Sequence, residues 1–169
     1  VGPWQFIATT GHMYGLKDGF FIDDRSDLIK ATKAAARHLK DLHKIYKDWY
    51  LAFAAYNAGP GTVNKAIRRG RSKDYWKLST KKRRHFRQET KDYVPKILAA
   101  MHIVKNYRKY GYSEKSFGSP LNYERVTVPD ATDLKTIAKS SGSTISEIGK
   151  LNPALVMGIT PPNQHTTIY

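Results

Sequence analysis

Three short segments of the chain combine amide, phenol and aromatic side chains at predicted turns and helix ends. They are residues 2–6 (Gly-Pro-Trp-Gln-Phe), 55–59 (Ala-Tyr-Asn-Ala-Gly) and 89–96 (Glu-Thr-Lys-Asp-Tyr-Val-Pro-Lys). Aromatic rings stack on sugar rings, and amides and phenols supply the paired donors and acceptors that hydroxyl and acetamide groups need. The three segments together indicate a cleft for a sugar polymer.

The elements that carry these segments are predicted to be helices. Apolar residues recur at spacings of three and four from Leu28 to Tyr46, which predicts one helix with Ser26 as its N-cap. Asp48 is the expected cap of the next helix, residues 49–56, which is apolar on all sides and therefore belongs at the centre of a domain. Residues 57–61 contain two Gly and one Pro, which end that helix.

Three more helices are predicted before residue 112. Thr62 is expected to cap a short helix through Ile67, and residues 74–78 are expected to form another short turn of helix. In the long helix that follows, Pro95 is expected in the first turn or at a kink, and Gly111 marks the end. One face of this helix carries Tyr93, Val94, Ile97, Leu98, Met101, Val104 and Tyr107.

The chain is strongly basic, and the charge divides it into two parts. It contains 29 Lys and Arg against 14 Asp and Glu in 169 residues, a net charge of +15. Residues 1–112 carry this whole excess, whereas residues 113–169 are neutral. A basic domain favours polyanionic partners such as nucleic acid, anionic lipid or an acidic cell-wall polymer. The densest run, residues 81–84, is either a solvated face or a contact for an anionic substrate.

The composition also excludes several classes of protein. A hydrophobic fraction of 40% argues against disorder, and no apolar run reaches the length of a membrane span. Cys is absent, so neither a disulfide framework nor a thiolate metal site can form, and the six His show no metal-ligand spacing. No metal and no cofactor is expected. No nucleic-acid-binding motif accompanies the basic run, so nucleic acid is not the expected partner.

The tail of the chain has a different character. Residues 113–124 are mostly small, polar and turn-forming, as in a linker. Beyond them we predict a strand at 125–128, two small helices, and a returning strand at 167–169 that the chain end cuts short. The predicted domains are therefore 1–112, all helical with its start missing, a linker at 113–124, and a β-α-α-β module at 125–169.

The three segments resemble the motifs of the lytic murein transglycosylases with a goose-lysozyme-like catalytic domain, most of all the membrane-bound lytic transglycosylase D type. In that family a Gly-x-x-Gln, an Ala-Tyr-Asn-x-Gly and a Glu-Thr-x-x-Tyr-Val segment line the cleft. All three occur here in the same order, at residues 2–5, 55–59 and 89–94. The resemblance covers residues 1–112 and implies a mainly α, lysozyme-like helical fold.

The resemblance also implies roles for single residues. Gln5 would bind substrate near the scissile sugar, and Tyr56 and Asn57 would form the cleft floor, where Asn57 orients an acetamide or the catalytic carboxyl. Gly59, without a Cβ, would allow close backbone approach. Each residue also has a plainer interpretation. Tyr56 can be a core aromatic, and Asn57 and Gly59 can be helix-stop residues.

Two residues of the third segment complete the implied site. Glu89 would be a supporting carboxylate that bridges to the cleft, and Tyr93 would bind the catalytic acid or the sugar. Alternatively, Glu89 is a charge at a helix N-terminus and Tyr93 is a packing residue. Before this segment the family has a short turn with Pro, whereas this chain has the basic run, so the cleft edge is expected to differ.

The implied reaction needs one carboxylic acid. That acid protonates the glycosidic oxygen and then takes the proton of the muramic acid C6 hydroxyl, which attacks the anomeric carbon and forms a 1,6-anhydro ring. In the family this Glu lies in a Glu-Ser segment shortly before Gly-x-x-Gln, which begins here at Gly2. We therefore expect the acid upstream of Val1 and expect residues 1–169 alone to be inactive. The chain contains only four Glu: Glu89, Glu114, Glu124 and Glu147.

Residues 125–169 resemble a LysM-type module, which binds glycans that contain N-acetylglucosamine. The matching features are residues 126–128, Asp133-Leu134, Ile137-Ala138 and Asn152-Pro153. The usual Gly-Asp-Thr-Leu turn is degraded to Ala-Thr-Asp-Leu at 131–134. The module therefore either binds glycan or packs against the catalytic domain.

Together these interpretations predict an enzyme that cleaves the MurNAc–GlcNAc bond of peptidoglycan without water. The alternatives are a non-catalytic peptidoglycan-binding protein with a lysozyme-like cleft, a nucleic-acid binder, and a hydrolysing lysozyme. The resemblance implies peptidoglycan glycan strands as the partner and a periplasmic or cell-envelope location. It is compatible with an outer-membrane lipoprotein whose upstream lipid anchor attaches it to the membrane.

Overall fold

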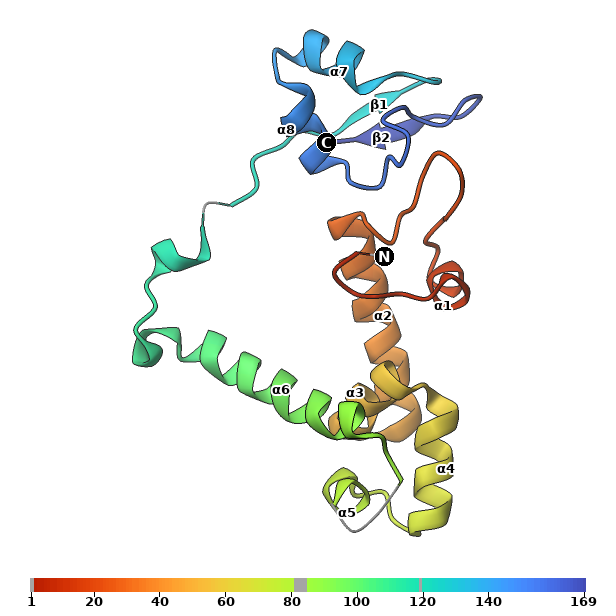
Figure 1. Ribbon diagram of the computed structural model, residues 1–169, viewed down its shortest axis with the longest axis vertical. Helices are drawn as coiled ribbons and strands as arrows, with labels where there is room; N and C mark the ends of the chain where they lie inside the picture. The colour runs from red at the N-terminus through yellow and green to blue at the C-terminus, as the bar shows by residue number, and fades with distance from the viewer. Residues whose placement is uncertain (1, 81–84, 119) are drawn as a thin grey trace. The chain divides into compact units, whose positions relative to one another are not determined.

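The computed structural model describes residues 2–80, 85–118 and 120–169, and it is mainly helical (Figure 1). The predicted mainly α fold class is confirmed. By their contacts the residues form two compact units: unit 1 comprises residues 1–37 and 121–169, and unit 2 comprises residues 38–120. The predicted boundaries at 112 and 124 stay a prediction.

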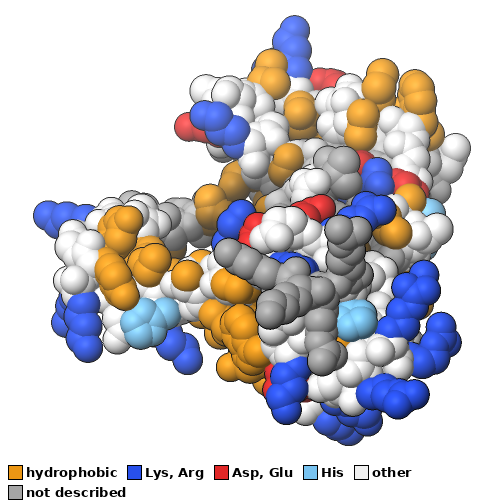
Figure 2. Space-filling view, turned by 60° about the horizontal axis from the view of Figure 1, so that its bottom comes forward, with side chains coloured by type: hydrophobic (Ala, Val, Ile, Leu, Met, Phe, Trp, Pro, Cys, Tyr) orange, Lys and Arg blue, Asp and Glu red, His pale blue; other side chains and the backbone are white. Residues whose placement is uncertain are grey.

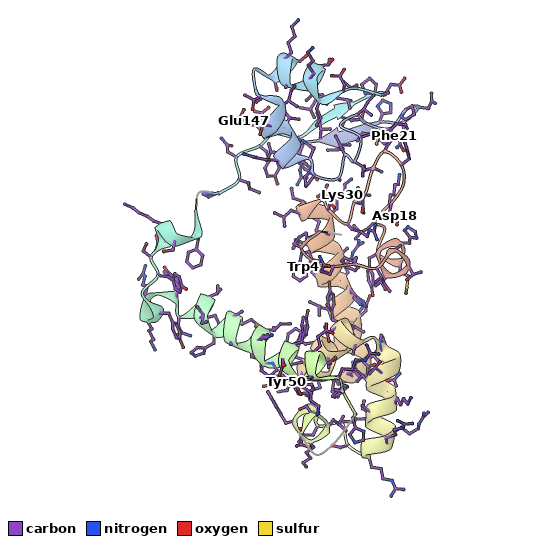
Figure 3. The ribbon with its side chains drawn as sticks, in the orientation of Figure 1. Trp4, Asp18, Phe21, Lys30, Tyr50 and Glu147 are labelled. Atoms are coloured by element: carbon purple, nitrogen blue, oxygen red, sulfur yellow. The ribbon has the colours of Figure 1, made fainter. Side chains whose placement is uncertain are left out.

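Unit 1 begins with a turn and the short helix α1 (Ala8–Met13), which the sequence analysis did not predict. Helix α2 (Leu28–Tyr46) spans the predicted apolar residues and contributes to both units. Its cap is Asp27 and not the predicted Ser26, because the Asp27 carboxylate accepts the backbone N–H of Lys30 at 2.8 Å. Trp4 is directed at α2, where its indole Nε1–H donates to the Thr32 hydroxyl at 2.8 Å (Figure 3). This bond fixes the N-terminal turn against the helix.

The tail within unit 1 has the predicted β-α-α-β order. Its elements are β1 (Val126–Val128), α7 (Leu134–Ser141), α8 (Ile145–Leu151) and β2 (Thr166–Ile168), with β1 and β2 paired antiparallel. Asp133 caps α7, and Thr144 with Glu147 forms a capping box on α8. A small core of Ile137, Ala138, Ile148 and Ile168 lies between the helices and the strands.

Unit 2 is built around α3 (Trp49–Ala58). Asp48 caps this helix as predicted, because its carboxylate accepts the backbone N–H of Leu51 at 2.8 Å. Leu51, Ala52, Ala54 and Ala55 are fully buried. Helices α4 (Pro60–Gly70) and α6 (Gln88–Lys105) pack against α3 (Figure 1). The central position predicted for α3 is confirmed.

Of two helix starts predicted in unit 2, one is wrong and one is confirmed. Helix α4 begins at Pro60 and not at Thr62, because Pro fits the first position of a helix, where no N–H bond is needed. Helix α5 (Tyr75–Ser79) begins as predicted, with the Asp74 carboxylate accepting two backbone N–H bonds.

The long helix α6 contains Pro95 as its eighth residue, so of the two expected placements the first turn is wrong and the kink stays a prediction. Pro95 has no N–H for the Lys91 carbonyl one turn earlier. The buried hydroxyl of Tyr75 lies 3.1 Å from the Lys91 carbonyl and 3.1 Å from the Thr90 carbonyl, so a side chain from α5 supplies a donor there. Helix α6 ends at Lys105, and Gly111 instead ends the 3-10 turn Tyr107–Tyr110.

Candidate active site

The centre of the candidate site is the side-chain amide of Asn57, in the last turn of α3. Its Nδ2 donates to Glu89 Oε1 at 3.1 Å, and its Oδ1 accepts from the Thr90 hydroxyl at 2.7 Å. Both partners lie in the first turn of α6, which packs against α3. Two predicted site residues, Asn57 and Glu89, are therefore in direct contact. The amide keeps its second N–H for another acceptor.

Thr90 is a site residue that the sequence analysis did not assign. Its side chain is buried, and its hydroxyl holds the Asn57 oxygen. The only signal in the sequence was its place between Glu89 and Tyr93 in the third segment. The Thr90 hydroxyl on α6 therefore holds the Asn57 amide at the end of α3.

These groups border a pocket of about 270 Å³. It is lined by Asn57, Ala58, Thr62, Arg87, Glu89 and Thr90. The lining offers an amide, a carboxylate, hydroxyls and a guanidinium, which are groups that pair with sugar hydroxyls and acetamides. Arg87 and Thr62 were not predicted as site residues, although Arg87 follows the basic run for which an anionic-substrate contact was one interpretation.

Tyr56 and Tyr93 are half-buried phenols on α3 and α6. Burial, with a smaller contribution from the nearby Tyr93, raises the pKa of Tyr56 to about 12. Burial also raises the pKa of Tyr93. Both phenols therefore keep their protons at neutral pH and can donate hydrogen bonds. His38 lies with its ring 5.2 Å from that of Tyr56, and burial lowers its pKa.

Gly59 joins α3 to α4 with φ +82° and ψ 147°, a combination that essentially only Gly adopts. A Cβ built there would meet no atom within 4 Å in the part of the chain that the structure describes, so the backbone is open on that side with respect to those residues. The conformation explains why Gly is needed at the junction, independently of any ligand.

Gln5 lies in unit 1, in the N-terminal turn. It is exposed with φ +52°, and its Nε2 donates to the Gly2 carbonyl at 2.6 Å. Gly2 has φ +66°, and a Cβ there would lie 1.8 Å from the Arg25 carbonyl oxygen. The Gly-x-x-Gln segment is therefore a tight turn that only Gly permits at its first position.

Residues 81–84, the densest part of the basic run, lie outside the described residues. Among the residues that are described, no group of three or more His, Cys, Asp or Glu side chains is placed to hold a metal ion. No helix within the described ranges combines the length and the apolar character that a membrane span requires.

Residues 1–79 match the family model of the Transglycosylase SLT domain. The matched part of the chain carries the first two motifs. The chain is also 37% identical over 157 residues to the membrane-bound lytic murein transglycosylase D of Escherichia coli strain K12. The protein of the same name from Escherichia coli O6:H1 gives the same identity. The match covers 90% of this chain but only 33% of each relative.

Proposed function

We propose that the protein is a lytic transglycosylase that cleaves the glycan strands of peptidoglycan. The observation that carries the proposal is the fixed amide of Asn57, held between Glu89 and Thr90. The Transglycosylase SLT domain and the relatives named for murein transglycosylase activity support the same substrate class. The chain spans about a third of those relatives, so the activity is proposed for the whole protein.

The proposed reaction breaks the bond between MurNAc C1 and the oxygen of the adjoining GlcNAc. A carboxylic acid gives its proton to that oxygen, which leaves with the bonding electrons. The C6 hydroxyl of the same MurNAc attacks C1, and the carboxylate takes the hydroxyl proton. The product is a 1,6-anhydro-MurNAc end. Attack within one sugar needs no positioned water, so one carboxyl group suffices where hydrolysing glycosidases use two.

Glu89 has the geometry of a supporting group in this proposal. It is exposed, and its carboxylate accepts from the Asn57 amide. A general acid that works near neutral pH is usually kept protonated by burial. We therefore propose that Glu89 positions Asn57 and that the acid is a Glu located before residue 1.

The remaining site residues would bind and orient the strand. The second N–H of Asn57 would donate to an acetamide oxygen or to the catalytic carboxyl, and Tyr56 and Tyr93 would donate from their phenols. Gln5 would bind near the scissile sugar. Gly59 would leave room for the strand at the backbone.

Mass spectrometry of the products from purified peptidoglycan tests this proposal. We expect 1,6-anhydro-muropeptides from a protein extended upstream through a Glu-Ser segment, and none from residues 1–169. Anhydro products from residues 1–169 would make Glu89 the first candidate for the acid. Reducing ends would indicate a hydrolysing lysozyme. Strand binding without cleavage by the extended protein would favour the non-catalytic peptidoglycan-binding alternative.

The proposal also implies a cellular location for the protein and a role for its tail. A peptidoglycan substrate implies the cell envelope or periplasm, and the relatives are named as membrane-bound enzymes. We propose that residues 125–169 are a LysM-like module, on the basis of their β-α-α-β order and the Asn152-Pro153 turn.

A further inference from the structure

A second, larger pocket borders the Asn57 pocket in unit 2. It has a volume of about 470 Å³ and lies between α4 and the residues just before α6. Thr62 and Arg87 line both pockets, so the two are continuous along one side of α4. A strand seated at Asn57 could therefore send a substituent into the second pocket. The lining residues are Thr62, Lys65, Ala66, Arg69, His85, Phe86 and Arg87.

The rim of this pocket is cationic and lacks compensating acids. Lys65, Arg69 and Arg87 are exposed, and none of them pairs with a carboxylate among residues 2–80, 85–118 and 120–169. Residues 49–73 contain five Lys and Arg and no Asp or Glu. Figure 2 shows Lys and Arg side chains gathered over α4. Clustered cations at a concave surface concentrate anions there.

The floor of the pocket is apolar. Ala66 and Phe86 are almost fully buried, and the Phe86 ring stacks on Tyr75 at 5.8 Å between centroids. The volume lies within the range of roughly 300–1,000 Å³ typical of pockets for small ligands. A cationic rim over a small apolar floor suits a short peptide that carries free carboxylates and small side chains. Arg binds such carboxylates through two parallel N–H bonds.

We infer that this pocket binds the carboxylates of the peptides attached to the glycan strand. The inference rests on the proposed function, because that function places the strand in the neighbouring pocket. It adds a specificity determinant: strands that carry peptides are preferred over bare strands. Arg69 and Lys65 are the residues that distinguish this pocket, since Arg87 also serves the Asn57 site.

The test is direct binding of residues 1–169 to peptide-bearing strands, to peptide-free strands and to the free peptide. Arg69→Gln is compared with Arg68→Gln, which removes the same charge from the same helix at a residue that does not line the pocket. We expect the native chain to bind peptide-bearing strands about tenfold more tightly than bare strands. R69Q should reduce that preference to about twofold, and R68Q should leave it nearly unchanged. Thermal melting checks that both variants fold.

Each other outcome is decisive. Equal affinity for both strands, with bare strands bound, overturns the inference and leaves the proposed function standing. An equal effect of R68Q and R69Q overturns it in favour of general attraction by net charge. A single-stranded oligonucleotide that competes better than peptide-bearing strands indicates a nucleic-acid surface instead. Binding of the free peptide without any strand binding supports the pocket but overturns the proposed function, and no binding at all overturns both.

Discussion

The candidate site depends on a few side chains that the protein itself holds in place. The Asn57 amide is fixed from both ends by neighbours on α6, and the Gly-x-x-Gln turn is fixed by close packing of Gly2 on the Arg25 carbonyl. Both are contacts between residues more than 20 positions apart in the chain. Their consequences can be measured one residue at a time.

Replacing Thr90 by Val should impair strand binding without unfolding the protein. The change removes the hydroxyl that donates to Asn57 Oδ1, so the amide loses one of its two fixed contacts. We expect the affinity for bare glycan strands to fall about tenfold, the value of one hydrogen bond. Thr90→Ser keeps the hydroxyl and should restore most of the affinity. Equal loss in both variants would contradict the positioning role.

Gly2→Ala should destabilise unit 1 much more than Gly15→Ala. Both residues have positive φ, +66° and +80°, so both variants carry the backbone cost of a Cβ. Only at Gly2 would the Cβ meet a backbone oxygen, whereas Gly15 has open space around it. We expect a difference of about 2 kcal/mol or more in the free energy of unfolding, measured by urea denaturation. If the two variants lose the same free energy of unfolding, the turn at Gly2 must rearrange to make room for the Cβ.

His38 should make stability depend on pH in the mildly acidic range. Burial lowers its pKa in the folded state, so the unfolded chain binds the proton more readily. Its contribution is therefore full above about pH 6.5 and is lost as the pH falls below that value. His38→Gln should flatten the fall in melting temperature between about pH 7 and 5. An unchanged pH profile would assign the effect to other groups.

At the scale of elements, unit 2 accommodates a Pro inside α6 by using a neighbouring helix. The Lys91 carbonyl, which Pro95 leaves without a helical donor, accepts from the buried Tyr75 hydroxyl of α5. A short helix of five residues thus stabilises the start of the helix that carries Glu89 and Thr90. The local break in one element is compensated by a tertiary contact.

A double-mutant cycle between Tyr75 and Pro95 measures this compensation. Tyr75→Phe alone should cost about 1–3 kcal/mol in the free energy of unfolding, because a buried carbonyl loses its donor. In a Pro95→Ala background the helix supplies its own N–H, so the same change should cost clearly less. Tyr50→Phe, on the adjacent helix α3, is the control for loss of a phenol. If Tyr75→Phe costs the same in both backgrounds, the Tyr75 hydroxyl does not compensate for the N–H that Pro95 lacks.

At the scale of the whole molecule, the tail and the N-terminal segment belong to the same compact unit although they are far apart in sequence. The Asp23 N–H donates to the Ala154 carbonyl at 2.8 Å, and the Val156 N–H donates to the Phe21 carbonyl at 3.0 Å. Ile22 and Leu155 form an antiparallel bridge between these bonds. The segment that carries Phe21 lies beside the tail (Figure 3).

Hydrogen exchange checks whether this contact persists in solution. We expect the amides of Asp23 and Val156 to exchange at least about tenfold more slowly than that of Met157, which donates no backbone bond among the described residues. Val156 is the sharper probe because it adjoins Met157 and both side chains are exposed. Equal exchange rates for these two neighbours would show that the tail separates from the N-terminal segment.

The sequence by itself determined most of the elements and the resemblance to a family of transglycosylases. Apolar spacing gave the bounds of α2, and Asp48 and Asp74 marked the starts of α3 and α5, because caps and periodicity act over a few residues. The motifs also singled out Asn57 and Glu89, which lie in the last turn of α3 and the first turn of α6. Local patterns carry this information because it depends on neighbours along the chain.

Only the tertiary structure decided which of these groups meet. The contact of Asn57 with Glu89 and Thr90 joins residues more than 30 positions apart, and it exists because α6 packs on α3. Packing of distant elements also brings the Tyr75 hydroxyl to the Lys91 carbonyl and forms the cationic pocket beside α4. In the same way it brings residues 21–23 into contact with the tail. Packing of distant elements fixes such contacts, and no short-range pattern in the chain records it.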